Sequence, residues 1–237
     1  MGFSKCKHTV FSLVAGGLLL AGLLLLLGGA AQVAHADPND LFAAPEGSGN
    51  DCSQASPCAL QTALDKATDG DTIYLAQGVY TGTGEAVITL IKSITLYGGW
   101  DGFPTGPIVR DPDTYPTILD GENQRRVIYI GGNISPTIEG FVIARGNASH
   151  APTNAGYGGG IYSLNATPII ANNLITGNVA YTGTAIAGNG GGLCIVNPAG
   201  TAVITGNRVI SNVASLNSNG AGGGIRLSSA SHAQVIN

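Results

Sequence analysis

An all-β solenoid, built from stacked coils of short strands, is the fold that this sequence predicts. The triplet Gly-Gly-Gly begins at Gly158, Gly190 and Gly222, so it recurs every 32 residues. A fixed period of this size is typical of solenoids, propellers and other repeat arrays. The composition favours β-structure, since the chain holds 37 glycines and only 10% charged residues. Turn-forming residues combined with few helix formers are expected in a turn-rich β fold.

A second repeat, containing asparagine, lies between the glycine triplets with a spacing of 34 residues. We expect Asn173 to stack on Asn207, and Asn178 on Asn212, because like residues of adjacent coils lie one above the other. Stacked asparagines can hydrogen-bond side chain to side chain. The matching positions are Ile170, Asn173, Ile175, Asn178 and Ala180 with Ile204, Asn207, Val209, Asn212 and Ala214, and a degenerate copy is Ile138, Phe141, Ile143 and Asn147.

Other repeat architectures fit less well. Helical repeats need long apolar stripes with a period of 3.6 residues, and a propeller blade needs about 40 residues for its four strands. The glycine triplets also differ from phosphate-binding loops, because they precede strand-like segments and carry no lysine. In a solenoid, glycine would permit a positive φ where the chain enters a strand.

The N-terminus predicts a secretory signal peptide over residues 1–36. A short basic region with Lys5 and Lys7 precedes an apolar stretch over residues 10–27, and Ala34-His35-Ala36 offers a cleavage site before Asp37. The alternative is an uncleaved membrane anchor, since the apolar stretch approaches the length of a membrane span. We expect export to the cell surface or medium, where a disulfide between Cys52 and Cys58 would form.

A short helix near residues 57–68 is expected to cap the first coil. Ser56 is a candidate N-cap with Pro57 at the first helical position, and Gly70 is a candidate stop. The apolar residues Leu60, Ala63, Leu64 and Ala67 would share one face. Residues 37–56 form an N-terminal segment, and 57–237 form the solenoid domain with coils from about Asp71. The last residues resemble the start of a further coil, so we expect an array truncated at its C-terminal end.

These features together resemble the pectate-lyase-like superfamily of right-handed parallel β-helix proteins. The resemblance implies a right-handed parallel β-helix from about residue 50 onward. Lyases of that superfamily use carboxylate-bound calcium and a basic residue, but this fold hosts many activities. The stretches that carry the resemblance are 60–75, 76–80, 94–100, 158–161, 169–180 and 203–214.

The placement of charge bears on catalysis. All fourteen carboxylates of the chain lie at or before Glu139, so the clear repeats lack the paired acids that glycoside hydrolysis requires. One acidic group precedes them, and four of its members are weak candidates for calcium. Turn formation is the favoured interpretation, because calcium needs six to eight oxygens. The acidic group comprises Asp101 and the four candidates Asp111, Asp113, Asp120 and Glu122.

Two basic elements lie near this acidic group. The pair Arg125-Arg126 would either bind a carboxylated sugar or, as we favour, pair with the acids at the surface. Arg145 and His150 flank a loop, and a solvated arginine is favoured over a lyase base. We assign no catalytic residue and no cofactor, with calcium as the open alternative.

The sequence therefore predicts a secreted or cell-surface module that is not catalytic and binds polysaccharide or a surface protein. The polar segments 178–190 and 212–222 suit hydrogen bonding to such partners. The net charge of −4 disfavours nucleic acid and anionic lipid. The alternative is a polysaccharide lyase or glycoside hydrolase with the same fold.

Overall fold

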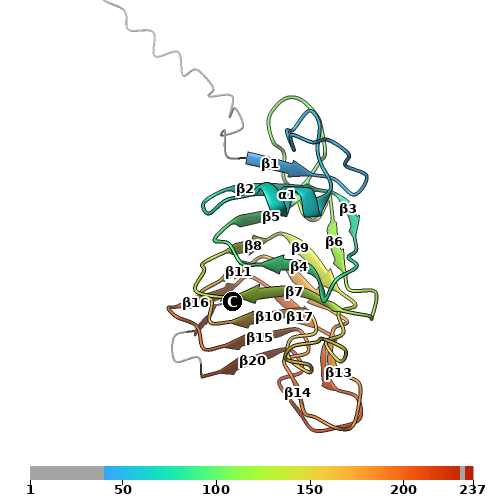
Figure 1. Cartoon of the computed structure of the whole chain (residues 1–237), viewed down its shortest axis with the longest axis vertical. Helices are drawn as coiled ribbons and strands as arrows, with labels where there is room; N and C mark the ends of the chain where they lie inside the picture. Colours follow the sequence, from blue (N-terminus) through green and yellow to red (C-terminus); the bar gives the residue numbers. More distant parts are fainter. Residues whose placement is uncertain (1–39, 230–232, 237) are drawn as a thin grey trace, which may run out of the picture. The chain divides into compact units, whose positions relative to one another are not determined.

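The computed structural model describes residues 40–229 and 233–236, and the predicted signal peptide lies outside this range. These residues form the parallel β-helix that the sequence predicts (Figure 1). Strands of three sheets alternate along the chain, and each strand pairs in parallel with its counterpart in the next coil. Crossover connections between parallel strands of one sheet are right-handed, so the helix is right-handed.

Each coil passes through the first sheet, the second and then the third. The first sheet contains β1 (Asp40–Ala43), β2 (Thr72–Ala76), β5 (Thr95–Trp100), β8 (Thr137–Glu139), β11 (Ile169–Ala171), β16 (Ala202–Thr205) and β21 (Ala233–Ile236). The second contains β3 (Gly78–Tyr80), β6 (Thr117–Asp120), β9 (Phe141–Ala144), β12 (Leu174–Thr176) and β17 (Arg208–Ile210). The third contains β4 (Ala86–Leu90), β7 (Arg126–Gly131), β10 (Ile161–Leu164), β15 (Leu193–Val196) and β20 (Ile225–Ser228).

The interior is a stack of aliphatic side chains in register. Ile138 pairs with Ile170 and Ile170 with Ile204, and all three are at most 2% exposed. The same holds in the third sheet, where Ile161 pairs with Leu193. Each buried residue of this kind contributes about 1.5–3 kcal/mol through removal of its side chain from water.

The predicted asparagine ladders are present at both bends that flank the second sheet. Asn173 Nδ2 donates to Asn207 Oδ1 at 2.9 Å, and Asn178 Nδ2 donates to Asn212 Oδ1 at 2.9 Å. The ladder of Asn178 and Asn212 also continues into the preceding coil, but not through Asn147, as the sequence repeat suggested. Asn178 Oδ1 accepts from the Gly146 amide at 2.8 Å, so Gly146 holds the equivalent position. Asn147 follows it and pairs with Val179.

The two repeat lengths, 32 and 34 residues, have a structural cause. Strands β10 and β15 are offset by 32 residues, whereas β11 and β16 are offset by 34. The turn from β15 to β16 is therefore two residues longer than the turn from β10 to β11 in the preceding coil. The loop between β18 (Val213–Ser215) and β19 (Gly220–Ala221) loses two relative to the earlier loop. Insertions and deletions therefore fall in the bends, and the strands keep their register.

The glycine triplets lie where the chain enters the third sheet. Gly158, Gly190 and Gly222, the first residue of each triplet, have φ of 56°, 63° and 69°, as predicted. At Gly159 an added Cβ would collide with the Val179 carbonyl oxygen. The triplets thus permit a left-handed turn followed by close backbone contact between adjacent segments.

The capping helix exists but is shorter than expected. It spans Leu60–Lys66, with Ala59 as N-cap and Ala67 as C-cap, so the prediction of Ser56 as the N-cap and Gly70 as the stop was wrong. Cys58 cannot be helical, because its amide donates to the Phe42 carbonyl of β1 at 3.0 Å.

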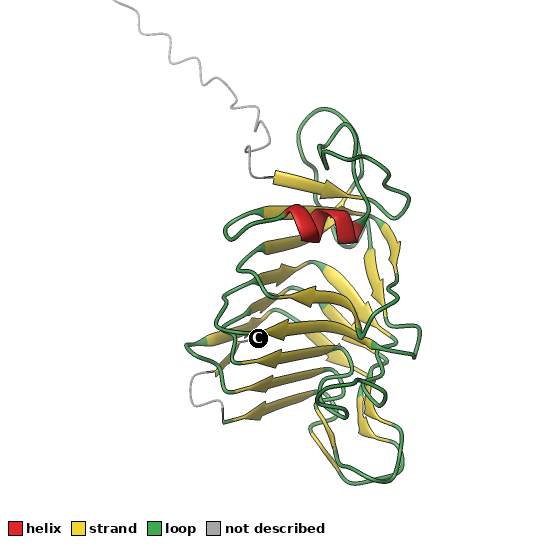
Figure 2. Cartoon of the chain, viewed as in Figure 1, coloured by secondary structure: helices red, strands yellow, loops and turns green. Residues whose placement is uncertain are grey.

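The helix lies at the N-terminal end of the coil stack (Figure 2) and contacts β1 and β2. Its apolar face is buried as predicted, with Leu60, Ala63 and Leu64 in the common core. The expected disulfide joins Cys52 to Cys58. Strand β1, which the sequence analysis did not predict, pairs with β2 and adds one more level to the first sheet.

Exposure increases at the other end of the described stack. Leu227 and Val235 are 38% and 55% exposed, although their register partners Ile195 and Ile204 are at most 2% exposed. In the described part of the chain, no helix has the length and apolar character needed to cross a bilayer.

We predict that Asn178→Ala lowers the free energy of unfolding by about 3 kcal/mol. The fully buried Asn178 side chain accepts a hydrogen bond from the Gly146 amide and donates one to the Ile143 carbonyl. Each buried group that loses its partner costs about 1–3 kcal/mol. Urea unfolding measures the change. Asn133→Ala, at an exposed position, is the matched control and should change stability by less than about 0.5 kcal/mol. Equal stabilities of the two variants would contradict a structural role for the ladder.

Candidate functional site

The structure separates the predicted acidic group instead of gathering it. Asp111 stabilises its own turn, where its carboxylate accepts from the Asp113 amide at 3.1 Å and from Thr114 Oγ1 at 2.7 Å. The hydrogen bonds from Thr114 lower the pKa of the Asp111 carboxyl. Asp101 similarly accepts from the Phe103 amide at 3.1 Å. These acids act as turn formers, which is the interpretation that the sequence favoured.

The other two candidate ligands are engaged by arginines. Asp120, at the end of β6, forms a two-point ion pair with Arg145 of the next coil. Glu122 pairs with Arg125 at 2.9 Å. Arg145 is exposed, as the sequence analysis favoured, but it has an acidic partner, Asp120, that lies 25 residues away in the sequence. Within residues 40–229 and 233–236, no three His, Cys, Asp or Glu side chains are placed to hold a metal.

Asp120 is only 7% exposed in its side chain, whereas Arg145 is 58% exposed. Burial of Asp120 opposes ionisation, but hydrogen bonds from Arg145 and from the Glu122 amide outweigh it and lower the pKa of the Asp120 carboxyl. This pair ties one coil to the next at the bend after the second sheet.

Arg126 is buried, which corrects the expectation of a surface pair. Its side chain is fully inaccessible and forms an ion pair with Glu85 at 3.0 Å. It also donates to the Asn154 carbonyl at 3.0 Å and lies 5.0 Å from the ring centroid of Tyr162. Burial lowers the pKa of this guanidinium. Arg126 therefore anchors the loop over residues 145–160 and is unavailable to a sugar.

Glu85 also reaches the neighbourhood of His150. Glu85, Arg125 and His150 line a pocket of 250 Å³ at the bend between the second and third sheets. The sequence analysis did not identify Glu85 as an acidic neighbour of His150, because the two residues lie in different coils and 65 positions apart. Glu85 Oε1 is already held by Arg126 and by Thr153 Oγ1 at 3.2 Å, so part of its charge is used structurally.

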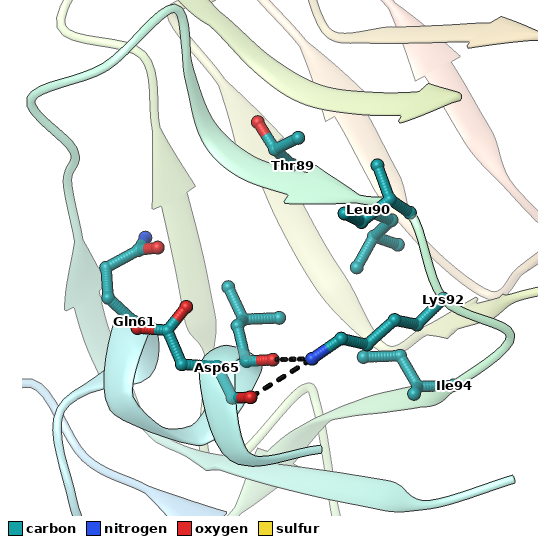
Figure 3. A pocket seen from close by; sticks show the side chains of 8 residues that line it. Gln61, Asp65, Thr89, Leu90, Lys92 and Ile94 are labelled. Atoms are coloured by element: carbon teal, nitrogen blue, oxygen red, sulfur yellow. Dashed lines mark hydrogen bonds between the residues drawn. The ribbon is translucent and has the colours of Figure 1, made fainter. Parts of the chain in front are cut away.

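A pocket of 240 Å³ separates the capping helix from β4 (Figure 3). Lys92 closes it by donating to the carbonyls of Leu64, Asp65 and Ala67 at 2.7–3.1 Å. A cation at the last carbonyls of a helix stabilises its C-terminus. The ammonium group of Lys92 is occupied by these carbonyls, so we assign the pocket a structural role.

A larger, shallow depression that is open to solvent, called the lobe cavity below, lies in a side lobe, which we define as residues 179–189 and 213–221. The lobe comprises β13 (Val179–Tyr181), β14 (Gly188–Asn189), β18 and β19, whose parallel pairs are separate from the three sheets (Figure 1). Hydrogen bonds hold its two loops together, including Asn217 Nδ2 to the Thr182 carbonyl at 2.8 Å. Ser149 Oγ fixes the base of the lobe through Thr182 Oγ1 at 2.9 Å.

The lobe cavity has a volume of 460 Å³, and its lining carries hydroxyl, amide and backbone groups without an ionisable side chain. Thr184 and Asn219 are exposed, and their side chains make no hydrogen bond within the described residues. Ile186, at 41% exposure, adds an apolar edge. The lining is Thr184, Ala185, Ile186, Ala187, Asn217, Ser218 and Asn219. Both loops fall in the polar segments that the sequence analysis singled out.

Tyrosine rings at the first sheet are engaged in packing. Tyr80 is 4% exposed and donates to the Ala76 carbonyl at 3.0 Å. Tyr74 stacks on Phe42 and lies tilted against Tyr97, and Arg110 covers one face of the Tyr97 ring at 3.9 Å. This aromatic ladder therefore stabilises the first sheet.

No protein-family model and no curated protein matches the chain. Among solved structures, the crystal structure of pectate lyase Pel9A is similar over 67% of this chain, with 14% identity and a TM-score of 0.32. The similar region spans 46% of that protein.

We predict that Asp120→Asn removes a pH-dependent part of the stability. The pKa of Asp120 is lowered on folding, so its stabilising contribution is present above the unfolded value of about 3.9 and is lost as the pH falls through the folded value. Because Arg145 is largely exposed, the contribution should be about 1 kcal/mol.

Urea unfolding between pH 7 and pH 2 tests this prediction. The stability difference between the wild type and Asp120→Asn should be present at neutral pH and disappear under acidic conditions. Asp113→Asn, at an exposed carboxylate without an ion pair in the described residues, should retain the pH dependence of the wild type. A difference that grows on acidification would contradict the proposed pairing.

Proposed function

We propose that this chain is an exported, non-catalytic module that binds neutral polysaccharide through the side lobe. The observation that supports it most is the 460 Å³ lobe cavity, whose lining offers hydrogen-bonding groups but no charge. Its volume falls within the range of about 300–1,000 Å³ that is usual for ligand sites. A neutral, hydroxyl-rich ligand matches this lining, because a charged ligand would lose hydration without gaining an ionic partner.

The lobe also provides the apolar contact that a sugar ring needs. Ile186 and Leu216 are 41% and 57% exposed on its two loops, so the C–H face of a sugar can pack there while its hydroxyls reach Thr184 and Asn219. Acid–base chemistry requires a group that gains or loses a proton, and the lining has none. Binding without bond cleavage is the outcome that this chemistry supports.

Export is part of the proposal. The Cys52–Cys58 disulfide is consistent with an oxidising compartment, and the apolar N-terminal sequence supports a signal peptide. Cleavage of polysaccharide is the second candidate function. It is favoured by one observation, the pocket that Glu85, Arg125 and His150 share.

We predict that Thr184→Val and Asn219→Ala each weaken binding of a neutral polysaccharide by about three- to tenfold. Each substitution removes one hydrogen-bonding group, which contributes about 0.5–1.5 kcal/mol. Affinity gel electrophoresis on neutral and acidic polysaccharides measures the effect. Thr72→Val and Asn133→Ala are matched controls, because both residues lie outside the lobe, and they should bind as the wild type does.

A parallel assay for bond cleavage separates the two candidate functions. Binding that depends on the lobe, without turnover, agrees with the proposal. Turnover that is lost in His150→Ala would establish the enzymatic alternative instead. Retention of full affinity in both lobe variants, or binding of acidic polysaccharide alone, would contradict a neutral-sugar site in the lobe.

A further inference from the structure

A groove of 240 Å³ crosses the outer side of the bend between the first and second sheets. Its floor includes Gly140 and Asn172, which have positive φ of 81° and 54°. These left-handed residues let the backbone turn tightly at the bend, so the backbone itself forms the bottom of the groove. The wall at the N-terminal side comes from the loop that precedes β6, through Asp113.

Val142 and Leu174 line one side of this groove, and they belong to an aliphatic row on the second sheet that continues beyond the groove. Val79, Ile118, Val142 and Leu174 follow one another in register on adjacent strands. Val79 is 49% exposed and the other three are half-buried. Outward aliphatic residues in contiguous rows are a feature of surfaces that bind other proteins. Arg208 ends the row at the next position in register, opposite Leu174.

The groove has an unpaired charge at each end. Asp113 and Arg208 are both exposed, and neither side chain makes an ion pair or hydrogen bond within residues 40–229 and 233–236. This differs from Arg110, Arg125 and Arg145, each of which pairs with a carboxylate. The two free charges of opposite sign give the groove a direction, and complementary charges on a ligand would fix its register.

We propose that this groove binds an extended aliphatic peptide with a basic residue at one end and an acidic residue at the other. The levels of Gly140 and Gly206 are two coils apart, or about 10 Å. In an extended peptide alternate side chains share one face, so its first, third and fifth residues span about 13 Å.

The central aliphatic residue of the peptide would lie on Val142 and Leu174. Its basic residue would pair with Asp113, and its acidic residue would pair with Arg208. The two exposed charges, Asp113 and Arg208, favour a charged peptide over a neutral sugar, because a neutral sugar offers neither of them an ionic partner. The proposal is independent of the lobe and concerns a different surface.

The probe is the blocked peptide Lys-Ala-Val-Ala-Asp, titrated to millimolar concentration into the isotope-labelled full chain and followed by NMR. We expect saturable shifts of the Val142 and Leu174 resonances. Arg208→Glu should weaken this peptide about fivefold and favour Lys-Ala-Val-Ala-Lys by a similar factor. Leu174→Ser should weaken both peptides.

Lys66→Glu, the same charge change on the exposed capping helix, is the control and should leave both affinities unchanged. The inference is overturned if neither peptide gives saturable shifts, or if Arg208→Glu does not change the preference between them. Displacement of the peptide by a neutral oligosaccharide would also overturn it, because the groove would then be a sugar site. Thr184→Val should have no effect on the peptide, which distinguishes this result from failure of the lobe proposal.

Discussion

In-register stacking of the coils is the constraint on which the rest of this structure depends. Adjacent strands of each sheet lie about 4.8 Å apart, so each paired strand residue lies beside its counterpart one coil away. Aliphatic residues such as Ile170 and Ile204 satisfy this constraint by packing like on like. A buried polar residue must find its partners along the stack. Asn178 does so through Gly146 above and Asn212 below.

The same constraint decides where function can be placed. Strand residues are fixed by their neighbours, whereas the bends accept insertions without loss of register. The loop over residues 145–160, anchored by Arg126, and the two loops of the side lobe are such insertions. Charge follows this division as well. Three of the six arginines, Arg110, Arg126 and Arg145, pair across coils, and the lining of the lobe cavity is uncharged. The proposed binding surfaces therefore depend on a rigid stack that contributes little chemistry itself.

Sequence patterns predicted those features that repeat. Gly158 and Asn173 recur in successive coils, and Cys52 and Cys58 are close in sequence, so their roles follow from spacing. Features that depend on a single tertiary contact were not predictable. The start of the helix depends on the pairing of Cys58 with β1, and the burial of Arg126 depends on a loop more than twenty residues away. The lobe loops were recognised as polar segments, but their cavity required the structure.

Deletion of one complete coil tests the stacking account most directly. Thr176 pairs with Ile210, an offset of 34 residues, so removal of residues 177–210 joins equivalent positions and brings Asn212 to the place of Asn178. The account predicts a protein that still unfolds cooperatively in urea, with circular dichroism per residue like that of the wild type. Loss of cooperative unfolding after removal of this one complete coil would contradict the account.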